Sequence, residues 1–280
     1  MTDIYRNTDD ETRKGARDGQ RGFNSAPGFR QFPARAAGPL VGSRKLEGVS
    51  LNGLLANRLL SALPADEFAS LLSHLEPVSL IAGEELYKLD EEIGFVYFPE
   101  TAVISHLHFL SDGGMTEAAL VGREGMIGLS AVFNSPPPSY VTQVALAGNA
   151  LRVRAAIFRH LFALGGSIRQ TILGYAGARM AQLSQRVVCN VNHRLDERLC
   201  TWLLMVHDRA GEDLLALTHE QIARHLGARR AGVTEAACVL RQKNIIENAR
   251  GQIRVIDRQL LELSACECYP SVRVKFDAVP

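Results

Sequence analysis

Apolar residues recur every three or four positions between Asn52 and Leu75, and this period is interrupted at Pro64. Such spacing places apolar side chains on one face of a helix, and proline is disfavoured inside a helix. The segment is therefore predicted to form two short helices that pack through a leucine-rich face.

After Pro77 the pattern changes to short apolar or alternating runs separated by glycines. The runs are VSLIAGEEL, GFVYFPE, AVISHLHFL, TEAALVGREGMIGL and YVTQVALAG, with Asp112-Gly113-Gly114 as a hairpin signal. Short strands at close spacing are typical of antiparallel sheets. We expect a small barrel or roll from about Val78 to Val153, within a sensor domain at residues 49–164 that includes flanking helices.

A long, uninterrupted helical pattern follows Gly165-Gly166. Its apolar stripe is more extensive than a helix lying on one small roll requires, which predicts that the helix at residues 165–191 pairs in parallel with its copy in a homodimer. A second helix begins near Leu195 and is expected to end at Gly211, because glycine is a common C-terminal stop. The residues predicted for the dimer seam are Ile168, Ile172, Tyr175, Leu183 and Val187.

The most informative segment is Leu217–Asp257. Thr218 is followed three residues later by Gln221, the spacing of a capping box that satisfies two backbone donors at a helix start. Gly227 permits the tight turn before a second helix. Two short helices about a glycine turn make a helix-turn-helix. The residues expected to form the buried faces of the two helices are Ile222, Ala223, Leu226, Val233, Ala237 and Leu240.

The second helix is predicted to expose a mainly basic face. Arginine can bond guanine O6 and N7 together, glutamate can accept from cytosine N4, and threonine can meet phosphate or a thymine methyl group. The segment IIENARGQIRVID is predicted to form a strand, a turn at Arg250-Gly251 and a second strand, as the wing of a winged helix-turn-helix. We therefore expect double-stranded DNA to be the partner of residues 192–260, and residues 261–280 to form a C-terminal tail. The predicted DNA-binding residues are Thr218, Gln221, Arg229, Arg230, Thr234, Glu235, Arg241, Lys243 and Arg250.

The composition is that of a globular protein. The chain has 280 residues, 46% hydrophobic and 22% charged, which suits two domains. No run approaches the ~18 consecutive apolar residues of a membrane-spanning helix, and the polar N-terminus lacks the apolar core of a secretory signal. We therefore expect a cytoplasmic protein with no membrane partner. Residues 1–48 hold 7 Gly and 3 Pro without a sustained apolar period, and are predicted to be a disordered arm.

The net charge of +1 hides an uneven distribution. Residues 49–192 hold 9 Lys and Arg against 12 Asp and Glu, whereas residues 217–259 hold 8 against 4. An acidic-leaning middle beside a basic patch indicates a sensor joined to an anion-binding module.

The winged segment and the order of parts, namely roll, long helix and winged helix, resemble the Crp/Fnr family of bacterial transcription regulators. The resemblance covers roughly Asn52–Asp257. It implies an α+β fold with a cyclic-nucleotide-binding-like β-roll, dimerisation through the long helix, and a palindromic promoter site read by the second helix of each motif, with RNA polymerase as a further partner. The implied base-reading positions are Arg229, Arg230, Thr234 and Glu235. The chain departs from the family at Ala231, where many members have an acidic or polar reader, so the DNA consensus does not transfer.

Family members that bind cyclic AMP carry Gly-Glu-Leu in the roll, followed by an arginine that neutralises the cyclic phosphate. The corresponding stretch here is Glu124–Leu129, and no lysine or arginine occurs between Arg123 and Arg152. A buried anion needs a counter-charge. A conventional cyclic-nucleotide site is therefore not expected.

Metal and redox cofactors are not expected either. The oxygen-sensing branch of the family holds an iron–sulfur cluster with cysteines near the N-terminus, and this chain has none before Cys189. Its five cysteines are an odd number in the last third and are interpreted as reduced thiols. Cys266 and Cys268 supply only two thiolates, so without ligands from a second subunit they are interpreted as ordinary tail cysteines rather than a redox switch. His106 and His108 share a strand face but lack a third ligand.

An enzyme is not expected, because GxSxG, Walker and HExxH motifs are missing and no paired carboxylates suggest raised pKa values. One alternative stays open: a ligand- or protein-responsive interaction module whose winged helix docks protein rather than DNA. Exposed aromatic or aliphatic anchors on the second helix and wing would favour that alternative, whereas a basic surface favours DNA.

Overall fold

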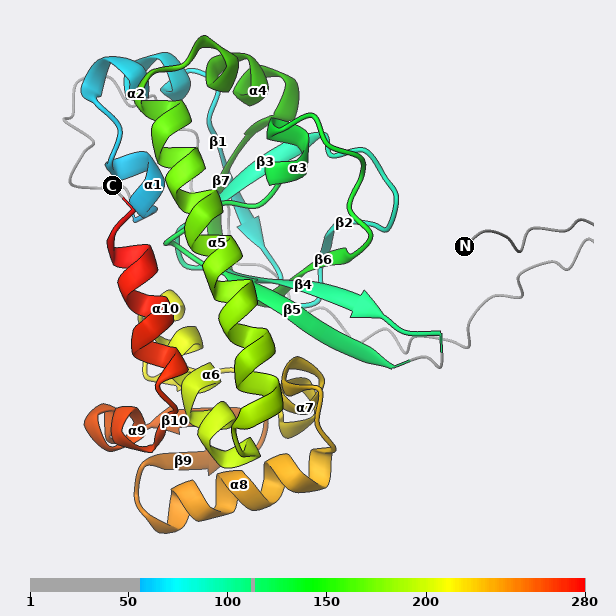
Figure 1. Ribbon diagram of the computed structural model, residues 1–280, viewed down its shortest axis with the longest axis vertical. Helices are drawn as coiled ribbons and strands as arrows, with labels where there is room; N and C mark the ends of the chain where they lie inside the picture. The colour runs from blue at the N-terminus through cyan, green and yellow to red at the C-terminus, as the bar shows by residue number, and fades with distance from the viewer. Residues whose placement is uncertain (1–55, 112–113, 280) are drawn as a thin grey trace, which may run out of the picture. The chain divides into compact units, whose positions relative to one another are not determined.

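The computed structural model describes residues 56–111 and 114–279. After two short helices, the chain forms an antiparallel roll of two sheets, with strand orders β1-β7-β3 and β2-β6-β4-β5 (Figure 1). The α+β fold class predicted from the sequence is confirmed, whereas the predicted arm at residues 1–48 lies outside the described residues. The strands of the roll are β1 (Glu76–Leu80), β2 (Glu85–Tyr87), β3 (Phe95–Pro99), β4 (Val103–Phe109), β5 (Met115–Val121), β6 (Val141–Leu146) and β7 (Gly148–Arg154).

The centre of the second sheet is β4, which pairs antiparallel with both β5 and β6. Ile104 and Leu107 of β4 are buried, whereas His106 and His108, which are two residues apart, are partly exposed. The β4–β5 register shifts between His106 and Leu107. Both histidine rings lie against Tyr140, so they share a face as predicted.

Short helices cover the first sheet of the roll. Pro64 stands directly before α2, so the interruption seen in the sequence separates two helices as predicted. Their leucine face packs with Phe98 of β3 and Phe158 of α4, whose rings meet edge to face at 5.3 Å. These helices are α1 (Arg58–Ser61), α2 (Ala65–Leu72), α3 (Leu129–Val132) and α4 (Ala155–Leu164).

The long helix α5 (Gly166–Asn192) begins at the predicted glycine pair. The Glu67 carboxylate accepts hydrogen bonds from the backbone amides of Ser167 and Ile168, both at 2.8 Å. These bonds lower the pKa of Glu67 and satisfy donors that would otherwise be free at the helix start. Although α5 has 27 residues, no helix within the described residues is long and apolar enough to cross a membrane.

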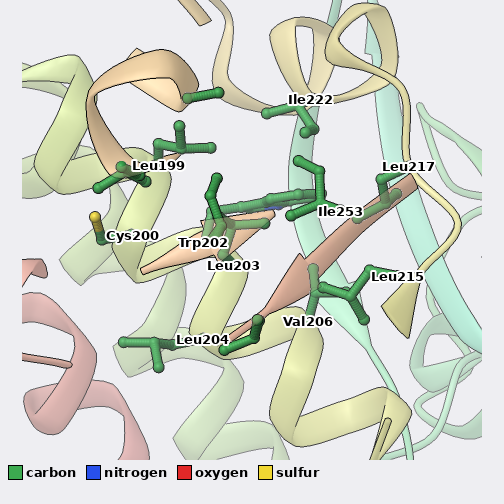
Figure 2. Packing of buried hydrophobic residues seen from close by; sticks show 14 of the residues in the cluster. Leu199, Cys200, Trp202, Leu203, Leu204, Val206, Leu215, Leu217, Ile222 and Ile253 are labelled. Carbon is green, nitrogen blue, oxygen red and sulfur yellow. The ribbon is translucent and has the colours of Figure 1, made fainter. Parts of the chain in front are cut away.

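The C-terminal domain packs around α6, whose Trp202 and Leu203 lie at the centre of a large hydrophobic cluster (Figure 2). Ile222 of α7 and Ile253 of β10 close on these residues. A third sheet has the order β8-β10-β9, and α6 ends at Gly211 as predicted. The elements are α6 (Leu195–Ala210), β8 (Leu214–Leu215), α7 (His219–Leu226), α8 (Arg230–Gln242), β9 (Ile246–Ala249), β10 (Gln252–Val255) and α9 (Arg258–Ser264).

The prediction of a plain tail at residues 261–280 is corrected by the last helix, α10 (Cys268–Asp277), which lies along α5 (Figure 1). Val272 and Phe276 are buried in the core of the roll, where the Phe276 and Tyr175 rings are 6.2 Å apart. Their spacing of four residues creates one apolar helix face. Neighbouring charges and Pro270 obscure this short pattern in the sequence.

Candidate nucleic-acid interface

The predicted helix-turn-helix is formed by α7 and α8. Gln221 accepts from the Thr218 backbone amide at 2.8 Å, and the Thr218 hydroxyl accepts from the Gln221 amide at 3.2 Å. The capping box therefore starts α7 as expected. Gly227 ends the helix in the left-handed conformation with φ of +59°, which glycine adopts without a steric penalty. The polar side-chain groups of Thr218 and Gln221 are therefore occupied by the hydrogen bonds that start α7.

The second helix, α8, packs on α6 through Val233, Ala237 and Leu240, which are buried as predicted. Its other face and the wing expose basic side chains. None of these makes an ion pair with the described residues, unlike the wing residue Arg254, which pairs with Glu247 at 3.8 Å. The unpaired and exposed cations are Arg229, Arg230, Arg241, Lys243 and Arg250. We call this group the basic face.

Two other predicted DNA-binding residues on α8, Thr234 and Glu235, differ in whether their side chains are hydrogen-bonded within the protein. Glu235 is exposed. The Thr234 hydroxyl donates to the Arg230 carbonyl at 3.0 Å and lies 3.1 Å from Nδ1 of His219, which joins the two helices of the motif. Burial, followed by the charge of Arg230, lowers the pKa of His219. The His219 imidazole is therefore neutral at pH 7 and shares a hydrogen bond with Thr234. The Thr234 hydroxyl is thus occupied by contacts within the motif.

The predicted wing is a hairpin of β9 and β10 with Ile246 opposite Val255 and Arg250-Gly251 at its turn. Ile253 is buried between this hairpin and the helices, while Arg250 projects at the exposed tip. A cation at such a tip can reach phosphate oxygens beside a groove without reading a base.

The predicted dimer seam divides into two parts. Ile168, Ile172 and Tyr175 are buried in the protein's own roll and against α10, so they are unavailable to a second chain. Their assignment to the seam is corrected, because the roll and α10 together cover the first half of α5 on that side. Leu183 and Val187 are exposed.

The exposed part of α5 carries a second apolar stripe, which we call the α5 seam. Its residues are Leu173, Met180, Leu183, Val187 and Val191, with exposed fractions of 51%, 71%, 41%, 65% and 78%. The seam follows a heptad pattern, since Leu173, Met180 and Val187 are seven residues apart and Leu183 lies between them. Apolar residues at a and d positions of heptads are typical of paired helices.

A buried ionic cluster joins the roll to the helix-turn-helix. The Glu117 carboxylate of β5 lies 2.7 Å from Nδ1 of His225 on α7 and 3.1 Å from the Arg186 guanidinium on α5. It also accepts from the Ser105 hydroxyl at 2.6 Å and from the Trp202 indole at 3.2 Å. Burial alone would raise the pKa of Glu117, but His225 and then Arg186 lower it well below its usual range. This cluster has no signal in the sequence because its members are distant in the chain: Glu117 and Trp202 are 85 positions apart.

A cavity of about 260 Å³ lies between the roll and α5. His106, Tyr140 and Met180 are among its lining residues, so it reaches the α5 seam. Burial, followed by the charge of Arg179, lowers the pKa of His106 to about 3, which leaves this imidazole neutral at pH 7. The Arg179 guanidinium donates to the Leu120 carbonyl at 2.7 Å and to Gln182 at 2.6 Å.

Glu124, the first residue of the stretch that corresponds to the Gly-Glu-Leu segment of the family, contacts α6. It lies 2.8 Å from Nε of Arg209 on α6. The adjacent Gly125 approaches α5 so closely that a Cβ there would lie 2.5 Å from the Tyr175 ring. Its amide donates to Gly122 at 3.1 Å, and the amide of Ile127 donates to Tyr97 at 3.0 Å. The loop is therefore closed on itself rather than arranged around an anion.

The model of the Crp-like helix-turn-helix domain matches residues 197–263. This range includes α7, α8 and the wing. No curated protein matches the chain significantly.

Several solved structures share the fold. FixK2 from Bradyrhizobium japonicum is 20% identical and has a TM-score of 0.60, covering 69% of this chain and 98% of its own. A Crp/Fnr-family regulator from Eubacterium rectale is 17% identical, with a TM-score of 0.58 and coverage of 74% and 97%. A CRP-family transcriptional regulator from Thermus thermophilus is 18% identical, with a TM-score of 0.57 and coverage of 67% and 96%. The matched domain and the shared architecture show that the chain has the fold of these structures, with a Crp-like helix-turn-helix domain at residues 197–263.

Proposed function

We propose that the protein is a cytoplasmic homodimer that binds a palindromic promoter site through α8 and the wing. In this proposal residues 49–164 sense a signal, residues 165–191 pair the two chains and residues 192–260 bind DNA. The observation that carries the proposal is the basic face, a group of exposed cations without ion-pair partners among the described residues. Unpaired cations on one surface favour a phosphate-rich partner, because binding releases the counterions of the nucleic acid.

The position of each cation suits one kind of DNA contact. Arg229 and Arg230 stand at the start of α8, and recognition helices contact base edges with their N-terminal residues. Arg241 and Lys243 lie at its end, and Arg250 lies at the tip of the wing, where backbone phosphates pass. The 13 residues of α8 span ~20 Å, which a major groove accommodates.

The α5 seam supports pairing of two chains. A parallel pair of α5 helices would place two copies of α8 about a two-fold axis, and their half-sites would lie about one helical turn, or ~34 Å, apart. A regulator bound at a promoter acts on the initiation of transcription, so RNA polymerase is the expected further partner.

Protein docking by the winged helix finds less support. On α8, the described exposed face carries Val239 as its large apolar side chain, and its exposed charges are mainly basic. Docking surfaces usually present clustered aromatic or aliphatic anchors.

Replacing Arg230 with alanine is expected to relax base preference and to weaken the selected site by about 1 to 3 kcal/mol, because a bidentate contact to one base is lost. Arg250→Ala should instead weaken selected and random DNA alike, since phosphate contacts carry no sequence information. Binding sites are first selected from a random DNA pool, and affinities are then measured by fluorescence anisotropy at several salt concentrations.

The matched control is Arg254→Ala, because Arg254 is exposed on the same wing but paired with Glu247. This variant should keep the affinity and salt dependence of the unmodified protein to within about twofold. Equal losses on selected and random DNA for Arg230→Ala would contradict its role in base reading. Failure to enrich any sequence from the pool would contradict the proposed function.

Cyclic AMP and cyclic GMP are not expected to control DNA binding. Glu124 is paired with Arg209, and the Arg179 side chain that borders the cavity donates to Leu120 and Gln182. Losing a hydrogen bond to a charged group costs about 1.5 to 3 kcal/mol, so losing two weakens binding by roughly two to four orders of magnitude. Calorimetric titration should detect no micromolar binding, and the nucleotides should leave DNA affinity unchanged. Saturable micromolar binding, or a tenfold gain in DNA affinity, would contradict this expectation.

A further inference from the structure

Four side chains that commonly ligate metals meet where the end of α5 faces the connection between α9 and α10. They are Cys189, His193, Cys266 and Cys268, and their ligand atoms all lie within 4.8 Å of one another. Cys189 and His193 are four residues apart and so lie on one side of the helix end. Cys266 follows Cys189 by 77 positions in the chain. We propose that these four residues bind a structural zinc ion.

Two of the ligand separations match those around a single tetrahedral ion. Sγ of Cys189 lies 3.6 Å from Sγ of Cys266, and Sγ of Cys268 lies 3.4 Å from Nδ1 of His193. Zinc bonds of about 2.3 Å to sulfur and 2.0 Å to nitrogen imply tetrahedral ligand separations of roughly 3.5 to 3.8 Å. An iron–sulfur cluster would need wider separations, because several metal and sulfide ions lie between its ligands. A disulfide would need sulfur atoms about 2.05 Å apart.

Neighbouring polar side chains contact the four proposed ligands, as is common around metal sites. Nε2 of His193 lies 3.1 Å from the Glu267 carboxylate, which leaves Nδ1 facing Cys268. A carboxylate that accepts from the other ring nitrogen is characteristic of zinc-bound histidine. Gln185 donates to Sγ of Cys268 at 3.1 Å, and the Thr201 hydroxyl lies 3.0 Å from Sγ of Cys266.

The chemistry of the three thiols also favours an ion. All three are buried, and they form a cluster of their own separate from the larger apolar cores. Zinc binds cysteine in its thiolate form, and three buried thiols beside one imidazole are a donor set that structural zinc sites use.

The surroundings provide a counter-charge and a route for the ion. Three thiolates, a neutral imidazole and Zn²⁺ carry a net charge of −1. The positively charged Arg198 side chain lines the same cavity as Cys189 and Cys268 and donates to the Leu226 carbonyl at the end of α7. A cavity lined by Cys189, Arg198 and Cys268 borders the cluster and offers access.

Four protein ligands leave no open position, which assigns the ion a structural role. It would fasten the α9–α10 connection to the end of α5, next to the first turn of α6. This proposal differs from the interpretation of Cys266 and Cys268 as ordinary tail cysteines. The two missing ligands come from the same chain, so a second subunit is not needed.

Elemental analysis of the full chain, purified under reducing conditions without chelators, is expected to find about one zinc per chain. Cys268→Ser and His193→Ala should lower the zinc content about tenfold or more, whereas His193→Cys should retain it, because a four-thiolate site also suits zinc. Cys238→Ser is the matched control, since Cys238 lies on α8 outside the cluster. Cobalt(II) supplied in place of zinc should give the visible absorption of a tetrahedral thiolate site in the wild type and in Cys238→Ser, but not in Cys268→Ser.

Several results would overturn the proposal. The first is that the wild-type protein contains no zinc and gives no tetrahedral cobalt spectrum. The second is that elemental analysis finds iron with acid-labile sulfide in place of zinc. A Cys189–Cys266 disulfide under reducing conditions, detected by peptide mass, would also contradict it. If Cys268→Ser does not fold, the zinc contents of His193→Ala and His193→Cys test the proposal instead. Zinc retained in both variants would exclude His193 as a ligand.

Discussion

Replacing Leu183 and Val187 together with aspartate is expected to convert the proposed dimer into monomers and to remove high-affinity binding to a full palindrome. Both side chains are exposed on the α5 seam, so the substitutions leave the core of the single chain intact. In a paired helix each chain would bring two carboxylates without partners into an apolar contact, at a cost of several kcal/mol.

The loss of DNA affinity follows from the loss of linkage between half-sites. Two linked binding modules can exceed the affinity of one by about 10² to 10⁴. The double variant should therefore bind a palindrome no better than a single half-site. Its affinity for one half-site should stay near that of the wild type, because α8 and the wing are unchanged.

The measurement is sedimentation equilibrium combined with titration of palindromic and half-site DNA. Val274→Asp is the matched control, because Val274 is comparably exposed but lies on α10, outside the α5 seam. It should keep the wild-type mass and affinity. A double variant that sediments with the wild-type mass and binds the full palindrome normally would show that the α5 seam does not pair the chains.

Features encoded over a few neighbouring residues could be predicted from the sequence. The Thr218–Gln221 capping box and the Gly227 turn depend on spacings of three or four residues, so the sequence alone locates the start and end of α7. The wing turn at Arg250-Gly251 and the end of α6 at Gly211 have the same local origin. These local signals explain why the helix-turn-helix was the most accurately predicted part.

Features that depend on distant parts of the chain were missed. The periodicity of α5 identifies apolar positions but not their neighbours, so it predicts Tyr175 in a dimer seam although this residue packs on Phe276 of α10. The four cysteine and histidine ligands are divided between two segments, so each segment looked incomplete. Periodicity and spacing describe one element, whereas these sites form only when the fold brings separate elements together.

Glu117→Gln is expected to destabilise the protein by about 3 to 5 kcal/mol, because removing one member of a buried ionic cluster leaves the others without compensation. The substitution conserves volume but leaves Arg186 and His225 around a neutral amide. Since Glu117 belongs to β5 and His225 to α7, we expect the contact between the roll and the helix-turn-helix to open before the rest unfolds. Denaturant unfolding at pH 7 gives the free energy, and hydrogen exchange locates the opening.

The difference in unfolding free energy between the wild type and Glu117→Gln should depend on pH in one direction. The pKa of Glu117 is lowered in the folded state from its ordinary value of 4.5. The ionised carboxylate therefore stabilises the fold fully above about pH 4.5, and the stabilisation decreases as the pH falls toward the folded-state pKa. The difference in stability between the wild type and Glu117→Gln should therefore shrink as the pH falls below about 4.5, because only the wild type loses an ionised carboxylate there.

Glu247→Gln tests whether burial is responsible for the effect. Glu247 forms an ion pair with Arg254 on the exposed wing, where such a pair is worth about 0 to 1 kcal/mol. Its loss should therefore be small and should weaken further in high salt, whereas the loss at Glu117 should persist in salt because the cluster is buried. Pairing Glu117→Gln with Arg186→Gln should recover more than about 1 kcal/mol relative to the sum of the single changes. Additive losses, or a Glu117→Gln variant as stable as the wild type, would mean that the cluster does not hold the roll against the helix-turn-helix.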